Sequence, residues 1–208
     1  MKLEKIVEEV NQLKKCNTKK VIDERIEQFK KNRKTPNKIF SELCFCLLTA
    51  NFNAEGAIKI QNKIGSKFHM LSEKQLAEKL KELGHRFPNK RAEYIFLASN
   101  QRQNIFNALK TFHGEELREW LVKNIKGFGL KEASHFLRNI GFENYAIIDF
   151  HIIDLLVKNK IIKKPQMLTR KKYLEIEKIL EIIAGETKLS LGKLDLYLWF
   201  METGKILK

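Results

Sequence analysis

Residues 121–137 read LVKNIKGFGLKEASHFL. The apolar spacing of this stretch indicates one helix that stops at a Gly-x-Gly turn, formed by Gly127 and Gly129, and a second helix that follows at once. Both glycines permit positive φ and the close approach of another backbone, while the free amides of the second helix favour a phosphate. Lys131 stands in the first turn of that second helix. The pattern predicts a helix-hairpin-helix over about residues 117–140.

An acidic residue, Asp149, follows Lys131 by eighteen positions, within the apolar run AIIDFHII at residues 146–153. A carboxylate in such a run is costly to bury unless it is paired, hydrogen-bonded or used in chemistry. A structural alternative is that Asp149 caps a helix beginning at Phe150, and this role is compatible with a functional one.

The hairpin lysine and the Asp-x-His that follows resemble the helix-hairpin-helix superfamily of base-excision DNA glycosylases. The loop at residues 141–145 lacks the proline that is typical of that superfamily. Within it, the run KGFGLKEASHFLRN at residues 126–139 and the terminal Lys208 are similar to the archaeal-type 8-oxoguanine DNA glycosylase/lyases. The resemblance implies an all-α fold, with residues 1–208 forming a single unit of two intimately packed helical lobes and the hairpin beside the active-site cleft.

The same resemblance implies a catalytic pair that removes 8-oxoguanine from double-stranded DNA. Lys131 is then the nucleophile, whose neutral amine attacks C1′ and forms a Schiff base that permits β-elimination 3′ to the abasic site. Asp149 is its partner, and its carboxylate stabilises the positive charge that develops on the sugar. Two alternatives stay open: a glycosylase for another oxidised base, and a non-catalytic helix-hairpin-helix module that binds DNA.

Two loops are candidates for contacts around the lesion. Asn51 and Asn53 end an apolar helix and resemble the Asn-rich turn that probes the cytosine opposite 8-oxoguanine, although an ordinary helix stop with a left-handed Asn would look the same. Flipping a nucleotide out of the duplex leaves a gap that a side chain must fill. Phe87 is the predicted wedge, with core packing as its alternative, and Arg86 is predicted to lie near the opposite strand.

The remaining candidate contacts come from the hairpin and the end of the chain. Gly127 and Gly129 are predicted to present amides to DNA, and His151 resembles the phosphate-contacting histidine of the family, unless it only covers its helix. Trp199 is a candidate platform for the extruded base or else a core tryptophan. Lys208 is the family's terminal lysine, which implies a part in distinguishing 8-oxoguanine from guanine.

The composition favours a polyanionic partner and argues against a catalytic metal or an iron–sulfur cluster. Forty Lys and Arg residues against 25 Asp and Glu give a formal net charge of +15, which favours nucleic acid. No cysteine follows Cys46, so the four-cysteine cluster of related endonuclease-type glycosylases is not expected. The five histidines show no metal-ligand spacing, so neither a catalytic metal nor a cofactor is predicted. The resemblance leaves open a structural monovalent ion at the hairpin carbonyls. Without a signal peptide or a membrane-length apolar run, we expect an intracellular protein of the cytoplasm or nucleoid, with no membrane partner. The resemblance implies a monomer.

Apolar residues that recur every three or four positions, with only three prolines and ten glycines, predict an almost wholly helical chain. Thr35 before Pro36 is a predicted helix start, and Ser72 with Gln75 a predicted capping box. The predicted helices span about residues 2–15, 18–31, 36–50, 54–65, 72–83, 89–100, 114–125, 130–140, 149–158, 170–184 and 189–202.

Overall fold

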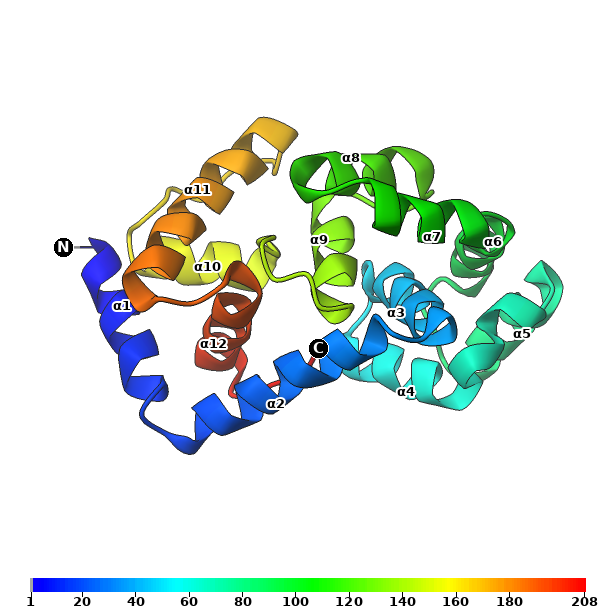
Figure 1. Ribbon diagram of the computed structural model, residues 1–208, viewed down its shortest axis with the longest axis horizontal. Helices are drawn as coiled ribbons and strands as arrows, with labels where there is room; N and C mark the ends of the chain where they lie inside the picture. Colours follow the sequence, from blue (N-terminus) through cyan, green and yellow to red (C-terminus); the bar gives the residue numbers. More distant parts are fainter. Residues whose placement is uncertain (1) are drawn as a thin grey trace. The chain divides into compact units, whose positions relative to one another are not determined.

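The protein is all-α in its computed structural model, which describes residues 2–208 (Figure 1). Twelve α-helices, one 3-10 helix and no strand occur in this described part of the chain. They are α1 (Lys2–Leu13), α2 (Asn17–Asn32), α3 (Pro36–Thr49), α4 (Ala54–Ile64), η1 (Gly65–Met70), α5 (Glu73–Glu82), α6 (Pro88–Asn100), α7 (Arg102–Thr111), α8 (Gly114–Asn124), α9 (Leu130–Asn139), α10 (Phe150–Lys158), α11 (Arg170–Thr187) and α12 (Leu191–Thr203).

The helices form two compact units. The first, here called the central unit, comprises Lys31–Phe136. The second, the terminal unit, combines the chain up to Lys30 with Leu137–Lys208.

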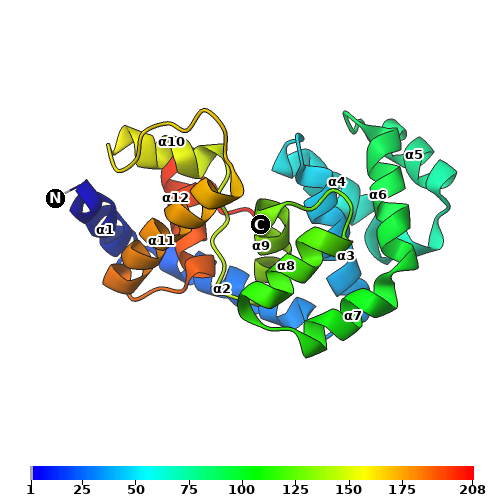
Figure 2. The same cartoon turned by 90° about the horizontal axis from the view of Figure 1, so that it is seen from above.

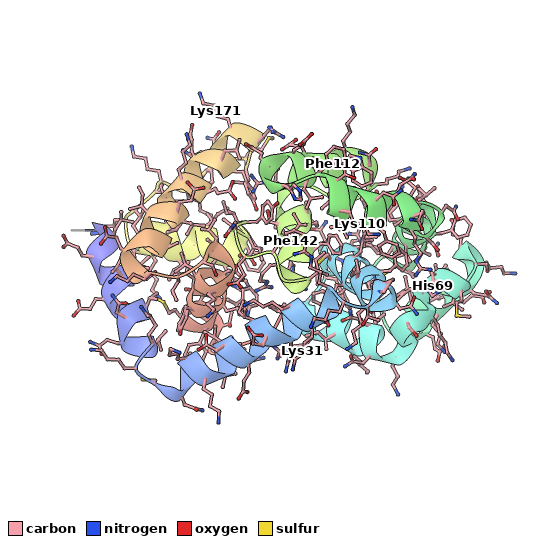
Figure 3. The ribbon with its side chains drawn as sticks, in the orientation of Figure 1. Lys31, His69, Lys110, Phe112, Phe142 and Lys171 are labelled. Atoms are coloured by element: carbon pink, nitrogen blue, oxygen red, sulfur yellow. The ribbon has the colours of Figure 1, made fainter. Side chains whose placement is uncertain are left out.

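The central unit is built around α3, whose residues from Leu43 to Leu48 are completely buried. Pro36 occupies the start of this helix, where its missing amide costs nothing. Helix α3 packs against α4, η1 and α6, while α5 lies beside α6 and α7 beside α8. Figure 3 shows Phe112 where α7 gives way to α8, and its ring stacks on that of Trp120 with centroids 6.4 Å apart.

The terminal unit packs α12 against α1, α10 and α11, and α1 also lies against α11. Both views show α12 beside α10 and α11 (Figures 1 and 2). The side chains of Ser190 and Thr169 accept hydrogen bonds from the first turns of α12 and α11. A buried ion pair between Arg138 and Asp195, 2.7 Å long, ties α9 to α12 within this unit. These contacts fix the helices around the segment that carries Asp149.

The loop at residues 141–145, where the superfamily has a proline, is held by side-chain contacts instead. Gly141 has φ +86°, and a Cβ there would lie 2.8 Å from Cα of Lys30. The Glu143 carboxylate pairs with Lys30 at 3.2 Å and accepts a hydrogen bond from the Ser190 hydroxyl at 2.5 Å. The loop is therefore cross-linked to α2 and to the start of α12.

The sequence-based helix assignments are confirmed, with two omissions. The reciprocal capping box of Ser72 and Gln75 is present, whereas Thr35 occupies the cap position without a side-chain hydrogen bond. Helix α7 and the 3-10 turn η1 were not predicted. Helix α7 buries only Ile105, Ala108 and Leu109, which is too short a stripe to stand out from a polar sequence. Among residues 2–208, no helix has the length and apolar character needed to cross a membrane.

Candidate active site

The turn between α8 and α9 uses its two glycines for different reasons. Gly127 has φ +94°, and a Cβ there would lie 2.4 Å from the ring of Tyr94. Gly129 does not have a positive φ, so that expectation was wrong for this residue. A Cβ at Gly129 would instead lie 3.2 Å from Oε2 of Glu132. The first glycine therefore makes the bend, and the second leaves room for a carboxylate.

Lys131 lies in the first turn of α9, and its side chain is 27% exposed. Its Nζ is 3.5 Å from Oε1 of Glu132, whose Oε2 accepts a hydrogen bond of 3.1 Å from the Gly129 amide. The Ala133 amide donates to the Gly129 carbonyl at 3.0 Å, which begins the helix. The amine is thus accessible and stands beside a carboxylate that is itself anchored to the turn.

Further charged groups line the edge of the hairpin. The carboxylate of Glu93, on α6, accepts hydrogen bonds from Lys126 at 2.8 Å and Lys90 at 2.9 Å. These two hydrogen bonds, that of Lys126 first, lower the pKa of Glu93. Both lysine nitrogens also lie near the Tyr94 ring, at 6.0 and 5.2 Å from its centroid. The edge carries two lysines for one carboxylate, which suits an approaching phosphate.

The Asn51 turn has the local structure of a helix stop. Asn51 has φ +57°, and the Asn53 side chain caps α4 by accepting a 2.7 Å hydrogen bond from the Gly56 amide. The left-handed conformation considered as the alternative for this turn is therefore present. Both asparagines are exposed, which leaves them accessible to a partner.

Phe87 is not a core residue, because 39% of it is exposed. The Arg86 guanidinium lies over its ring, 5.0 Å from the centroid. The Phe87 amide donates to Nδ1 of the buried His85 at 3.0 Å, and Nε2 of the same ring is 3.0 Å from the Leu48 carbonyl. The His85 ring also lies 4.3 Å from that of Phe52.

His85 therefore connects the loop of Phe87 to the end of α3, a role that we did not predict. Its pKa is lowered, chiefly by burial and secondarily by Arg91, against a hydrogen bond to the Leu48 carbonyl. Arg91 reinforces the connection by donating to the Ala50 carbonyl at 2.5 Å. The spacing of apolar residues along the chain cannot predict such contacts, because they join residues far apart in the sequence.

In the terminal unit, Asp149 is the N-cap of α10, as its structural alternative suggested. Its Oδ1 accepts a hydrogen bond of 3.0 Å from the Ile152 amide. The segment before it is fixed by Tyr173, whose hydroxyl donates to the Ala146 carbonyl at 2.7 Å and accepts from the Ile148 amide at 3.3 Å. The carboxylate is therefore oriented by main-chain groups and is only partly exposed.

An aromatic group continues from Asp149 along the terminal unit. The ring of His151 lies 4.5 Å from that of Trp199 in an edge-on arrangement, and 3.9 Å from that of Phe150. Phe150 is 65% exposed, although it is large and apolar. Trp199 and Lys208 are both partly exposed, so Trp199 is not a fully buried core residue. Phe150 was not predicted as a site residue, because an apolar residue at the start of a helix usually packs inward.

The predicted site residues are divided between the two units, and within them the structure shows contacts of His151 with Trp199 and of Arg86 with Phe87. The central unit contains Lys131 with Gly127 and Gly129, and the loops of Asn51, Asn53, Arg86 and Phe87. The terminal unit contains Asp149, His151, Trp199 and Lys208.

An all-α chain with a glycine hairpin, a lysine in its second helix and a later aspartate cap belongs to the helix-hairpin-helix class. Residues 22–189 match the family model described as 8-oxoguanine DNA glycosylase. The 8-oxoguanine DNA glycosylase/AP lyase of Korarchaeum cryptofilum is 51% identical, over 100% of both chains. The crystal structure of the Methanocaldococcus jannaschii 8-oxoguanine glycosylase/lyase with a 15mer DNA containing 8-oxoguanine superimposes with a TM-score of 0.93, at 51% identity, covering 98% of this chain and 99% of that one. For the 8-oxoguanine DNA glycosylase of Thermotoga maritima, the TM-score is 0.92 at 42% identity, with 99% and 100% covered. The chain belongs to the 8-oxoguanine DNA glycosylase family.

Proposed function

We propose that this protein is a base-excision repair enzyme that removes 8-oxoguanine from double-stranded DNA and cleaves the strand at the resulting abasic site. The observation that carries the proposal is the likeness, over 98% of this chain and at 51% identity, to a structure solved with DNA containing 8-oxoguanine. The Korarchaeum relative, named as both glycosylase and AP lyase, supports the two activities.

The proposed chemistry assigns one role to Lys131 and another to Asp149. The neutral amine of Lys131 attacks C1′, the glycosidic bond breaks, and the oxidised base leaves with the bonding electrons. The amine adduct then opens the sugar to a Schiff base. Loss of a C2′ proton expels the 3′ phosphate by β-elimination. The ionised carboxylate of Asp149 stabilises the positive charge on the sugar.

The other candidate residues hold the DNA and the base in this proposal. The amides around Gly127 and Gly129 and the ring of His151 contact phosphates, while Trp199 and Lys208 contact the extruded base. Phe87 fills the gap in the duplex, and Arg86, Asn51 and Asn53 face the opposite strand. The exposed positions of Phe87, Arg86 and both asparagines support these roles. The protein acts as a monomer, in the cytoplasm or nucleoid, where its DNA substrate is.

Borohydride trapping on an 8-oxoguanine:cytosine duplex tests the proposal. Wild-type protein should give a covalent adduct and 3′ cleavage, and Lys131→Gln should lose both by a factor on the order of 10³ or more while still binding DNA. Lys126→Gln is the matched control, because it removes a lysine from the same hairpin and should still form the adduct at saturating protein.

Three outcomes would contradict parts of the proposal. An adduct that forms equally well with Lys131→Gln would remove the assigned nucleophile. Faster excision from a duplex carrying an oxidised pyrimidine would change the substrate. A protein that binds DNA but neither excises a base nor cleaves a strand would be a binding module.

A further inference from the structure

Positive charge is concentrated at the end of α10, in the loop that follows it and in the first turn of α11. Residues 155–174 contain seven Lys and Arg residues and no Asp or Glu. Figure 3 shows the Lys171 side chain extending away from α11. Six of the seven are exposed and all lie in the terminal unit; they are here called the basic strip: Lys158, Lys160, Lys163, Lys164, Arg170 and Lys171.

Much of this charge is not neutralised by acidic side chains. Lys158, Lys160 and Lys163 form no ion pair within residues 2–208. Lys164 pairs with Asp154 at 2.9 Å, but the two side chains are 69% and 45% exposed, and so open a contact is screened by water and salt. The basic strip therefore keeps a positive field that an anionic partner can meet.

The stability of the fold does not account for the whole strip. Arg170 and Lys171 stand in the first turn of α11, which contains no acidic residue, although a helix dipole favours anions at that end. Lys160 has φ +56°, a conformation that glycine adopts at lower cost. Only Lys158, in the last turn of α10, stands where the dipole favours a cation. Three of the six positions thus lower stability, so a partner explains the charges better than folding does.

One end of the strip is tied to the segment that carries Asp149. The hydroxyl of Tyr173, one helical turn after Arg170, donates to the Ala146 carbonyl at 2.7 Å and accepts from the Ile148 amide at 3.3 Å. Asp149 follows directly in the chain. The first turn of α11 is therefore held beside the start of α10, where the proposed function places the sugar of the damaged nucleotide.

The other end of the strip lies at the far end of α10. The loop returns from there toward the beginning of α10 (Figures 1 and 2), and the contact of Lys164 with Asp154 marks its passage along the helix. With nine residues, α10 is about 13 Å long. One strand of DNA advances about 3.4 Å per nucleotide, so the strip is long enough to follow roughly four phosphates.

We infer that the basic strip binds the sugar–phosphate backbone of the duplex beside the lesion, over the nucleotides next to the one that is everted. This inference rests on the proposed function and extends it from the damaged nucleotide to its neighbours. Contacts with phosphates position a protein without reading bases. The strip therefore contributes to affinity and to its dependence on salt, and not to the choice of base or to the chemical step.

The test is a salt series of binding to an 8-oxoguanine:cytosine duplex, followed by fluorescence anisotropy. The double variant Lys163→Gln with Lys171→Gln removes two charges of the strip. Each lost phosphate contact should make the slope of log K against log salt shallower by about 0.9. The double variant should thus lose about 1.8 in slope and roughly 10-fold or more in affinity near 0.1 M salt. Single-turnover excision at saturating protein should keep the wild-type rate.

The matched control is the double variant Lys15→Gln with Lys188→Gln, which removes two exposed lysines from the same unit. Lys188 ends α11, and the Lys14 amine donates to the Thr187 carbonyl at 2.6 Å. Both control residues therefore lie at the opposite end of this 18-residue helix, about 27 Å from its first turn. This control should keep the wild-type slope.

A second pair of variants separates binding from folding. Lys160 and Lys188 have φ of +56° and +54°, so Lys160→Gly and Lys188→Gly each relieve a left-handed lysine and remove one charge. Both variants should melt at a higher temperature than wild type. Only Lys160→Gly should weaken binding to the duplex.

Ethylation interference locates the contacts on the DNA. Ethylated phosphates within about four nucleotides of the lesion, on one side of it, should block binding of wild-type protein and have no effect on the Lys163→Gln, Lys171→Gln variant. An unchanged slope in that variant would overturn the inference. An equal loss in the Lys15→Gln, Lys188→Gln control would also overturn it, since general attraction by net charge would then suffice. Failure of the proposed function is distinguishable, because binding is measured without excision and wild-type protein would then leave the base in place.

Discussion

The two proposed catalytic residues stand in opposite kinds of surroundings. Lys131 lies beside a charged side chain, because Oε1 of Glu132 is 3.5 Å from its Nζ. Asp149 is held by a main-chain amide, 3.0 Å from the carboxylate, at the end of an apolar segment. The amine is therefore in contact with another side chain, whereas the carboxylate is held by the backbone.

Side-chain length explains this difference. A lysine has four rotatable bonds, so its own backbone does not fix the position of its nitrogen, and a contact such as that with Glu132 is needed to hold it. An aspartate at an N-cap has its carboxylate fixed by one hydrogen bond, which typically contributes about 1 kcal/mol to stability. A partly exposed ion pair contributes roughly 0.2–1 kcal/mol. The two contacts are of similar strength, so the longer lysine side chain keeps more conformational freedom than the aspartate.

Asp149→Asn keeps the capping oxygen and removes the charge. Because the cap survives, the melting temperature should stay within a few degrees of wild type. Because the charge on the sugar is no longer stabilised, excision of 8-oxoguanine should slow roughly 100- to 1,000-fold. Single-turnover excision and thermal melting measure the two effects separately.

Two further variants serve as controls for that experiment. Asp149→Ala should lose the activity and, in addition, about 1 kcal/mol of stability. Asp154→Asn removes a charge from the same helix, where Asp154 pairs with Lys164, and should keep wild-type excision. If Asp149→Asn were as active as wild type, the carboxylate would be a helix cap without a catalytic part.

A second variant, Gly127→Ala, tests the turn that precedes the helix of Lys131. The added Cβ would lie 2.4 Å from the Tyr94 ring, at a residue whose φ is +94°. Together these two effects should lower the free energy of unfolding by about 3 kcal/mol. Gly65→Ala is the matched control, since Gly65 has φ +61° with no atom within 4 Å of the added carbon. It should lose only about 1 kcal/mol. Denaturant unfolding measures both, and equal losses would mean that the contact with Tyr94 is unimportant.

Features with a local signature were predictable from the sequence. The glycine hairpin, the capping box of Ser72 and the cap at Asp149 each depend on residues within a few positions of one another. The contacts of His85 with Leu48 and of Arg91 with Ala50 span 37 and 41 positions, so no periodic pattern reveals them. Glu132 was overlooked for another reason: a glutamate in a first helical turn is ordinary, and only the structure shows its shared oxygens.

The third and smallest expected effect concerns the acid sensitivity of the central unit. Burial lowers the pKa of His85 from its ordinary value of 6.5, and His69 is shifted in the same direction, also chiefly by burial. Below about pH 6.5 the unfolded chain therefore binds protons that the folded unit resists, and stability falls until the pH reaches the folded-state pKa. Above that window both states are neutral and the full stability is present.

His85→Gln tests whether His85 causes this loss of stability, because glutamine can still donate to the Leu48 carbonyl but does not titrate. The variant should lose about 1 kcal/mol near pH 8 and show a smaller decline between pH 7 and pH 5. Hydrogen exchange supplies a local readout in wild-type protein: the Phe87 amide, bonded to His85 Nδ1, should lose protection on acidification. The Gly56 amide, bonded to the non-ionising Asn53 side chain, should not. A Phe87 amide that stays protected at pH 5 would show that the acid sensitivity of the unit does not come from His85.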